Sequence, residues 1–137
     1  MAGVLSVTKR FRFEAAHQLP KYKGACSRLH GHSYVLEVTV GLRSKVDAIG
    51  EALDTQGMVM DFADLKSVVN RAIINRIDHT FLNESLPIAD TTAEAMLYYF
   101  AERLRRNIDN VVVYLKRLKL YETEDNYAEW NCNGVEQ

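Results

Sequence analysis

The sequence predicts a single α+β domain, in which an antiparallel sheet carries two helices on one face. Two segments near the N-terminus alternate between apolar and polar residues, two central segments repeat apolar residues at helical spacing, and two β-rich segments follow. The predicted order is therefore strand, strand, helix, helix, strand, strand. Runs of strands and helices, in place of strict alternation, are typical of α+β folds with antiparallel sheets.

The first two strands are predicted from alternation with a period of two. Apolar residues fill most odd positions of residues 5–19 and most even positions of residues 30–42, which is typical of strands buried on one face. His17 shares the apolar face of the first strand, and His30 and His32 share that of the second. Because the strands are consecutive, with one loop between them, we expect an antiparallel pair.

The first helix is predicted from a cap and from helical spacing. Residues 43–57 are polar and are predicted as a long turn, and residues 58–60 as a short extension of the sheet. Asp61 is the expected N-cap of a helix that reaches about residue 76, because apolar residues recur at helical spacing after it. A break over residues 77–83 ends this helix.

The second helix and the last two strands complete the predicted order. The helix is expected to begin at Thr91 or Thr92 and to end near residue 107, with an acidic residue in its first turn. A β-rich run over residues 111–121 predicts the third strand, and residues 127–133 predict a final short strand.

Length and composition limit the function classes. The chain has 137 residues, 47% of them hydrophobic, and a net charge of −1, so one domain over residues 1–137 can build a core without disulfides. Its two cysteines are too few for a secreted disulfide framework. Balanced charge without a basic patch argues against a nucleic-acid partner. No apolar run approaches the ~20 residues of a membrane span and no signal peptide opens the chain, which predicts a cytoplasmic protein without membrane contact.

Three of the four histidines form the pattern H-x12-H-x-H at His17, His30 and His32. On a strand, the H-x-H pair points both imidazoles to one face, and a histidine of the neighbouring strand can complete a site of three nitrogens. Three imidazole ligands with an open fourth position are typical of catalytic zinc (Zn²⁺), although imidazole also suits iron, nickel or copper. The alternative is that each histidine is an ordinary core residue.

Cys26 lies in the loop between these histidines. It could close a structural zinc site with the three histidines, act chemically through its thiolate, or be an inert thiol. Spacing alone leaves these three alternatives open.

Six motifs occur in one order along the chain: F-E-A-A-H-Q-L at 13–19, C-S-R-L-H-G-H-S-Y at 26–34, G-M-V-M-D-F-A-D-L-K at 57–66, I-D-H-T-F-L-N at 77–83, T-T-A-E at 91–94 and Y-E-T at 121–123. Together they resemble the 6-pyruvoyltetrahydropterin synthase family over residues 5–130. The spacing of three residues between Cys26 and H-G-H is similar to that of its bacterial branch, the 6-carboxy-5,6,7,8-tetrahydropterin synthases of queuosine biosynthesis. Residues 43–56 are longer than the family's usual connection and lie away from these motifs.

The resemblance implies a role for each matched residue. His17, His30 and His32 would bind zinc, Cys26 would act as general base, Asp78 and His79 would form a second catalytic pair, Glu122 would anchor the pterin, and Thr92 would line its pocket. An aspartate can orient a neighbouring imidazole, and a glutamate can accept two hydrogen bonds from the amino-pyrimidinone edge of a pterin. From the residues alone, Asp78 and His79 also suit an ordinary helix-to-loop segment, and Glu122 suits a solvated turn.

The resemblance also implies a tunnelling fold (T-fold), in which subunit sheets join into a barrel and trimers stack into a homohexamer with sites at subunit interfaces. The implied reaction converts 7,8-dihydroneopterin triphosphate into 6-carboxy-5,6,7,8-tetrahydropterin, releasing acetaldehyde and triphosphate, as a carbon–carbon lyase in the pathway of a tRNA modification. One alternative is a 6-pyruvoyltetrahydropterin synthase, which eliminates triphosphate without cleaving the side chain. A further alternative is a non-enzymatic module with a structural zinc site of one cysteine and three histidines.

Overall fold

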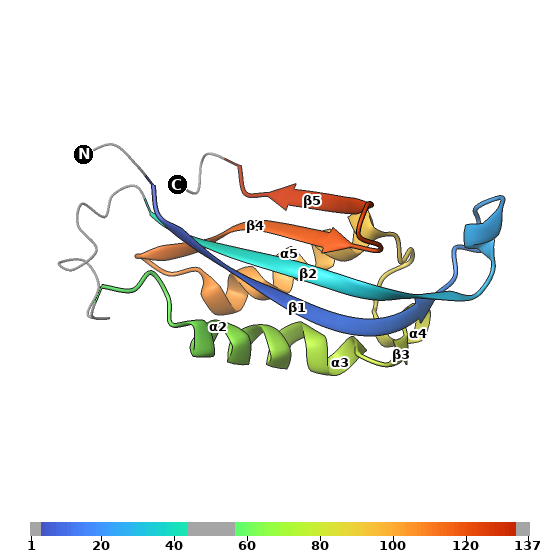
Figure 1. The fold of residues 1–137 in the computed structure, drawn as a ribbon, viewed down its shortest axis with the longest axis horizontal. Coiled ribbons are helices and arrows are strands. Elements are labelled where there is room, and N and C mark those ends of the chain that lie inside the picture. Colours follow the sequence, from blue (N-terminus) through green and yellow to red (C-terminus); the bar gives the residue numbers. More distant parts are fainter. Residues whose placement is uncertain (1–3, 44–56, 134–137) are drawn as a thin grey trace.

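The computed structural model describes residues 4–43 and 57–133, which form one sheet with helices on one of its faces (Figure 1). The elements in chain order are β1 (Ser6–His17), η1 (Ala25–Ser27), β2 (His30–Leu42), α2 (Phe62–Val69), η2 (Asn70–Ile74), α3 (Asn75–Ile77), β3 (Thr80–Phe81), α4 (Leu82–Ser85), α5 (Ala93–Ile108), β4 (Val113–Tyr121) and β5 (Tyr127–Asn131). The element η2 is a π-helix that continues α2 into α3 without a break. This arrangement confirms the predicted α+β class. No helix of the described residues has the length and apolarity to cross a membrane.

The strands of the sheet are ordered β3-β1-β2-β4-β5. β1 and β2 pair antiparallel along their length, so that His17 lies opposite His30 and Ala15 opposite His32. β3 pairs with β1 in parallel through the two residues of β3. The sheet is therefore mixed, which corrects the predicted antiparallel sheet. A strand of two residues is too short to give a periodic signal in the sequence.

Side-chain caps fix where both long helices begin. Asp61 accepts hydrogen bonds from two amides of the first turn at 2.6 and 3.3 Å, which confirms the predicted N-cap. The Thr92 hydroxyl accepts from the Ala95 amide at 3.2 Å, so Thr92 and not Thr91 caps the second helix. The residue before this cap, Thr91, contacts His17 at the end of β1.

The segments around the first long helix differ from the prediction. Residues 58–60 form no strand, so the predicted extension of the sheet is wrong. Val59 is instead buried against the core as a single residue. Of the predicted turn over 43–57, residues 44–56 lie outside the described residues. β3 and the start of α4 lie within the predicted break at 77–83.

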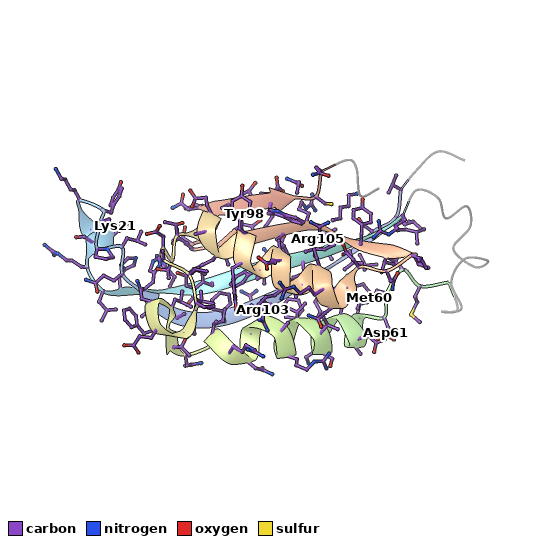
Figure 2. All side chains as sticks on the ribbon, turned by 180° about the vertical axis from the view of Figure 1, so that it is seen from behind. Lys21, Met60, Asp61, Tyr98, Arg103 and Arg105 are labelled. Carbon is purple, nitrogen blue, oxygen red and sulfur yellow. The ribbon has the colours of Figure 1, made fainter. Side chains whose placement is uncertain are left out.

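The hydrophobic core lies between the sheet and the helices. Figure 2 shows the helical side, with Arg103 between α5 and the segment from α2 to α3. The Arg103 Nε donates to the Ala72 carbonyl at 3.1 Å and so ties the two helical segments together. Fully buried side chains come from both layers, among them Leu36, Leu118, Leu65 and Phe100. Burying a side chain of this size stabilises a fold by roughly 1.5–3 kcal/mol, so this core holds the strands of the sheet in place.

One end of the sheet gathers the segments that carry the predicted site residues. β1 and β4 end there and β2 and α5 begin there, at the end from which the loop with η1 projects (Figure 1). Residues far apart in the sequence therefore meet at this end.

Candidate metal and catalytic site

His17, His30 and His32 come together at this end of the sheet. His17 is the last residue of β1, and His30 and His32 face the same side of β2 because side chains repeat every two residues. The strand register sets His17 opposite His30. One ligand nitrogen of each ring lies within 4.8 Å of the other two. The structure thus brings the three predicted ligands into one group.

Backbone carbonyls fix which nitrogen of two rings carries the proton. The Nδ1 atoms of His17 and His30 lie 2.8 Å from the Thr91 carbonyl oxygen and 2.7 Å from the Arg28 carbonyl oxygen, respectively. A carbonyl can only accept, so Nδ1–H donates in both rings and each Nε2 keeps its lone pair. The two Nε2 atoms lie 2.9 Å apart. Two lone pairs at that distance repel unless a cation lies between them, so these residues fit a metal ion.

Burial keeps two of the rings in the neutral form, which is the form that binds metal. It lowers the pKa of His17 below its ordinary value near 6.5, against the opposing effect of the hydrogen bond to the Thr91 carbonyl. Burial is also the main cause of the lowered pKa of His32, where the Glu122 carboxylate opposes it. At pH 7 these rings therefore offer lone pairs as ligands.

Cys26, Thr92 and Glu122 line one cavity with His17 and His32. The cavity has a volume of about 280 Å³ and is lined further by the first residues of α5 and those that follow β4. Cys26 is exposed, and in the described part of the chain the close group of ligand atoms consists of the three histidines without its sulfur. The thiol thus lies beside the histidines and outside their ligand set.

Glu122 directs its carboxylate toward the histidines. Its Oε2 lies 3.5 Å from Nε2 of His32 and 3.7 Å from Nε2 of His17. The turn that presents it is closed by the Glu122 amide, which donates to the Asn126 carbonyl at 3.0 Å. Atoms that ligate one tetrahedral zinc are roughly 3.3–3.4 Å apart. The carboxylate therefore stands next to an open ligand position and can balance the charge of a bound cation.

Asp78 and His79 form a pair that is held by β1. The Asp78 Oδ1 accepts a hydrogen bond from the Glu14 amide at 2.9 Å and lies 2.9 Å from the His79 Nδ1. These contacts lower the pKa of Asp78, with the Glu14 amide as the largest cause. His79 adopts a positive φ of 61°, which is uncommon for a residue with a side chain, and its amide donates to the Glu14 carbonyl.

The pair and the thiol belong to two neighbouring cavities. His79 lines an open cavity of about 570 Å³ together with Glu14 and His32. Cys26 lines the cavity of about 280 Å³ described above, and His32 lines both. The structure therefore brings all the predicted residues to one region but sets His79 and Cys26 on different sides of His32.

Sequence reasoning missed two residues of this region, Thr91 and Tyr34. Thr91 is fully buried and orients His17 through its backbone carbonyl, a contact that leaves no signal in the residue type. The Tyr34 hydroxyl is buried without a hydrogen-bond partner in the described residues. Its ring lies edge-on to His17 and His32 at centroid distances of 6.2 and 5.3 Å, and stacks on Phe13 at 4.7 Å. The alternation of β2, which places Tyr34 on the face of the two histidines, was the available signal.

Comparison with known proteins identifies the family. Residues 6–133 match the sequence model of 6-pyruvoyl tetrahydropterin synthase. The chain belongs to this family. A 6-carboxy-5,6,7,8-tetrahydropterin synthase of Synechocystis sp. is 40% identical over 102 residues, covering 72% of this chain and 73% of the relative. A 6-pyruvoyl tetrahydrobiopterin synthase of Pongo abelii is 32% identical over 133 residues, covering 88% of this chain and 86% of the relative.

The fold agrees with this membership. The structure of 6-pyruvoyl tetrahydropterin synthase from Caenorhabditis elegans matches with a TM-score of 0.77 at 24% identity, over 96% of this chain and 97% of that chain. This likeness confirms the predicted T-fold of the subunit. The family resemblance noted in the motifs is also confirmed, and proteins named 6-carboxytetrahydropterin synthase are among the relatives.

Proposed function

We propose that this family member is a zinc-dependent 6-carboxytetrahydropterin synthase, a carbon–carbon lyase that acts in the cytoplasm on 7,8-dihydroneopterin triphosphate in the pathway to queuosine. The group of three histidine nitrogens, with Cys26 and Glu122 beside it, carries the proposal. The 40% identity to a protein named 6-carboxy-5,6,7,8-tetrahydropterin synthase supports the choice of product. Oxidation of the side chain balances reduction of the ring, so the reaction needs no nicotinamide or flavin.

The proposal gives each side chain of the site a separate task. The three histidines would hold zinc through the nitrogens that face one another. When bound, zinc supplies Lewis acidity that acidifies a substrate hydroxyl. Cys26, as a thiolate, accepts a proton from the substrate side chain. His79, whose Nδ1 lies 2.9 Å from the Asp78 Oδ1, exchanges a proton with the substrate through its Nε2.

Glu122 anchors the pterin in this proposal, and Thr92 lines the pocket. A carboxylate that accepts two hydrogen bonds from the amino-pyrimidinone edge gives a strong and geometrically selective contact. Because Glu122 Oε2 lies 3.5 and 3.7 Å from two histidine nitrogens, its side chain must turn away from them when the pterin binds. Thr92 is fixed by its cap to the Ala95 amide and lines the same cavity.

We also propose that the working unit is a homohexamer, a dimer of trimers, whose sheets join into a barrel. Within the described residues, β3 pairs only with Ala15 and Ala16 of β1, so most of that edge of β1 has no strand partner. β5 forms the opposite edge of the sheet. Unpaired strand edges are normally covered in native proteins, and pairing between neighbouring subunits would cover both. Substrate sites at these contacts would draw residues from more than one subunit.

Metal content and product analysis of the wild type beside Cys26→Ala test the proposed function. The wild type should hold one zinc per chain and release acetaldehyde together with 6-carboxytetrahydropterin. Cys26→Ala should keep its zinc and lose turnover, because the sulfur lies outside the close ligand group. Loss of both zinc and fold in Cys26→Ala would favour a module with a structural zinc site in place of an enzyme.

A 6-pyruvoyltetrahydropterin synthase is the second candidate. The name of the matching family and the 32% identity to the Pongo abelii protein favour it. This reaction eliminates triphosphate and leaves the carbon chain of the substrate intact. Mass spectrometry of the product separates the two candidates, since a pyruvoyl product without acetaldehyde would contradict our first choice.

A further inference from the structure

The side chain of Asn83, in α4, holds the backbone just beyond the end of β1. Its Oδ1 accepts a hydrogen bond from the Gln18 amide at 2.9 Å, and its Nδ2 donates to the Gln18 carbonyl at 2.8 Å. One side-chain amide thus satisfies both backbone groups of Gln18, as a neighbouring strand would. This contact extends the short pairing between β1 and β3, and Gln18 directly follows the histidine that ends β1.

Asn83 also reaches the ring of His17 through Thr91. The Thr91 hydroxyl donates to the Asn83 Oδ1 at 3.3 Å, and the Thr91 carbonyl lies 2.8 Å from the His17 Nδ1. Thr91 and His17 are both almost completely buried, with 0% and 1% of their surface exposed. Asn83 therefore contacts both the backbone that follows His17 and Thr91, the residue that orients the His17 ring.

We propose that Asn83 is a positioning residue of the metal site, which holds His17 in the orientation that ligates. The inference rests on the proposed metal site and does not depend on the substrate or product. Groups that orient a ligating histidine through its second nitrogen typically change metal affinity by about 10–100-fold when they are removed. Asn83 does not touch the His17 ring directly, as Thr91 does. It acts on that ring through Thr91 and, in addition, on the backbone of Gln18.

The same contact extends to the loop that carries the thiol. The Leu19 amide donates to the Cys26 carbonyl at 3.0 Å, and the Gln18 Nε2 donates to the Ser27 carbonyl at 3.0 Å. When Asn83 fixes Gln18, it therefore also fixes the start of the hydrogen bonds that hold Cys26. Asn83 therefore contributes to the position of the thiol relative to His17.

Zinc affinity measured by competition with a chelator tests the proposal on Asn83→Ala. We expect zinc binding to weaken by about tenfold or more, and the visible spectrum of the cobalt-loaded protein to change, because the ligand geometry changes. Asn107→Ala is the matched control, since the Asn107 side chain donates to the Arg103 carbonyl at 2.9 Å on an exposed face of α5. Unchanged affinity in Asn83→Ala, or an equal loss in Asn107→Ala, would overturn the proposal.

A double-mutant cycle with Thr91→Val separates positioning from a general loss of stability. Thr91→Val removes the hydroxyl, which lies 3.3 Å from the Asn83 Oδ1 and 3.4 Å from the His17 Nδ1, and keeps the carbonyl that contacts His17. Because Asn83 acts on His17 partly through Thr91, the two effects on zinc affinity should sum to more than the effect of the double variant, whereas fully additive effects, as expected of independent destabilisation, contradict the contact through Thr91. The alkylation rate of Cys26, followed by peptide mass spectrometry, should change in Asn83→Ala and not in Asn107→Ala.

Asn83→Asp keeps the test usable if Asn83→Ala does not fold. The aspartate retains the acceptor for the Gln18 amide but loses the donor to the Gln18 carbonyl and sets a negative charge against it. Weaker zinc binding in this variant supports the proposal, and wild-type affinity overturns it. The proposed function is tested separately, by product analysis. Zinc binding can depend on Asn83 even if the wild type does not form the carboxylated product.

Discussion

The Nε2 atoms of His17 and His30 face each other at 2.9 Å, while the Nδ1 atom of each ring points to a backbone carbonyl. The carbonyls of Thr91 and Arg28 accept from the Nδ1–H of the two rings, so while both rings are neutral neither Nε2 can donate to the other. In the neutral rings the fold thus holds two lone pairs close together, an arrangement that a bound metal ion or a shared proton relieves. A third nitrogen, from His32, completes the group.

Zinc is expected to stabilise the protein by binding at these nitrogens. A ligand that binds only the folded state at about 100 times its Kd raises the free energy of unfolding by about 2.7 kcal/mol. The melting temperature should therefore rise with zinc concentration, and His32→Ala should remove most of the rise. His79→Ala is the control, because His79 lies outside the close ligand group. If the melting temperature of the wild type does not change with zinc concentration, the site does not bind zinc.

Acid should destabilise the metal-free protein in a defined direction. Burial lowers the pKa of His17 and His32 below the ordinary value near 6.5. As the pH falls through about 6.5, these two histidines bind protons in the unfolded chain while they are still neutral in the folded chain. The free energy of unfolding therefore decreases until the pH passes the lowered pKa values of the folded chain. Above that range the contribution of both rings is fully present. Urea unfolding in the presence of a chelator, from about pH 7.5 to about pH 5, measures this slope.

The variant that checks this pH dependence is His32→Gln, which removes one of the two titrating rings. Its free energy of unfolding should fall less steeply between the same pH values than that of the wild type. A wild-type protein that gained stability on acidification would contradict the pKa directions on which the expectation rests.

Much of the site could be predicted because period-two alternation also governs which way the histidines point. The apolar pattern of β1 and β2 set His17, His30 and His32 on the buried face, and the register between the strands then brought them together. The predicted N-cap at Asp61 was correct for a similar reason, since a cap depends on residues within one turn. These features are local, or follow from pairing between consecutive strands.

What the sequence did not predict depends on distant backbone contacts. Thr91 orients His17 through a carbonyl from 74 positions away, and Asn83 holds the Gln18 backbone from 65 positions away. Neither contact leaves a periodic pattern. The parallel strand β3 was missed because it has only two residues, and its place beside β1 is set by the Glu14 backbone, which holds the pair Asp78 and His79.

Asp78→Asn should lower turnover and leave zinc binding intact. The Asp78 carboxylate accepts from the Glu14 amide and faces the His79 Nδ1 at 2.9 Å, so it both anchors the loop and orients the imidazole with a negative charge beside it. An amide of the same shape keeps the anchor but loses the negative charge. A positioned acid or base typically contributes on the order of 10²–10⁴ in rate, so we expect kcat to fall by at least roughly 10².

Steady-state kinetics together with metal analysis check this expectation for Asp78→Asn. Zinc content should match that of the wild type, since the pair lies outside the close ligand group. The outcome that would refute the role is wild-type kcat in a variant that has full zinc, because the charge of Asp78 would then have no part in catalysis.

Tyr34→Phe should leave the protein as stable as the wild type or make it more stable. The Tyr34 hydroxyl is buried with no hydrogen-bond partner in the described residues, and burial is the main cause that raises the pKa of this phenol. An unsatisfied buried polar group costs about 1–3 kcal/mol, whereas the ring stacked on Phe13 at 4.7 Å remains in the variant. We expect the midpoint of urea unfolding to be equal or higher at an unchanged m-value.

Phe13→Ala, which removes the stacked partner, should instead lower the free energy of unfolding by about 3–5 kcal/mol. A loss of more than about 1 kcal/mol in Tyr34→Phe would show that the hydroxyl has a hydrogen-bond partner in solution, such as an ordered water.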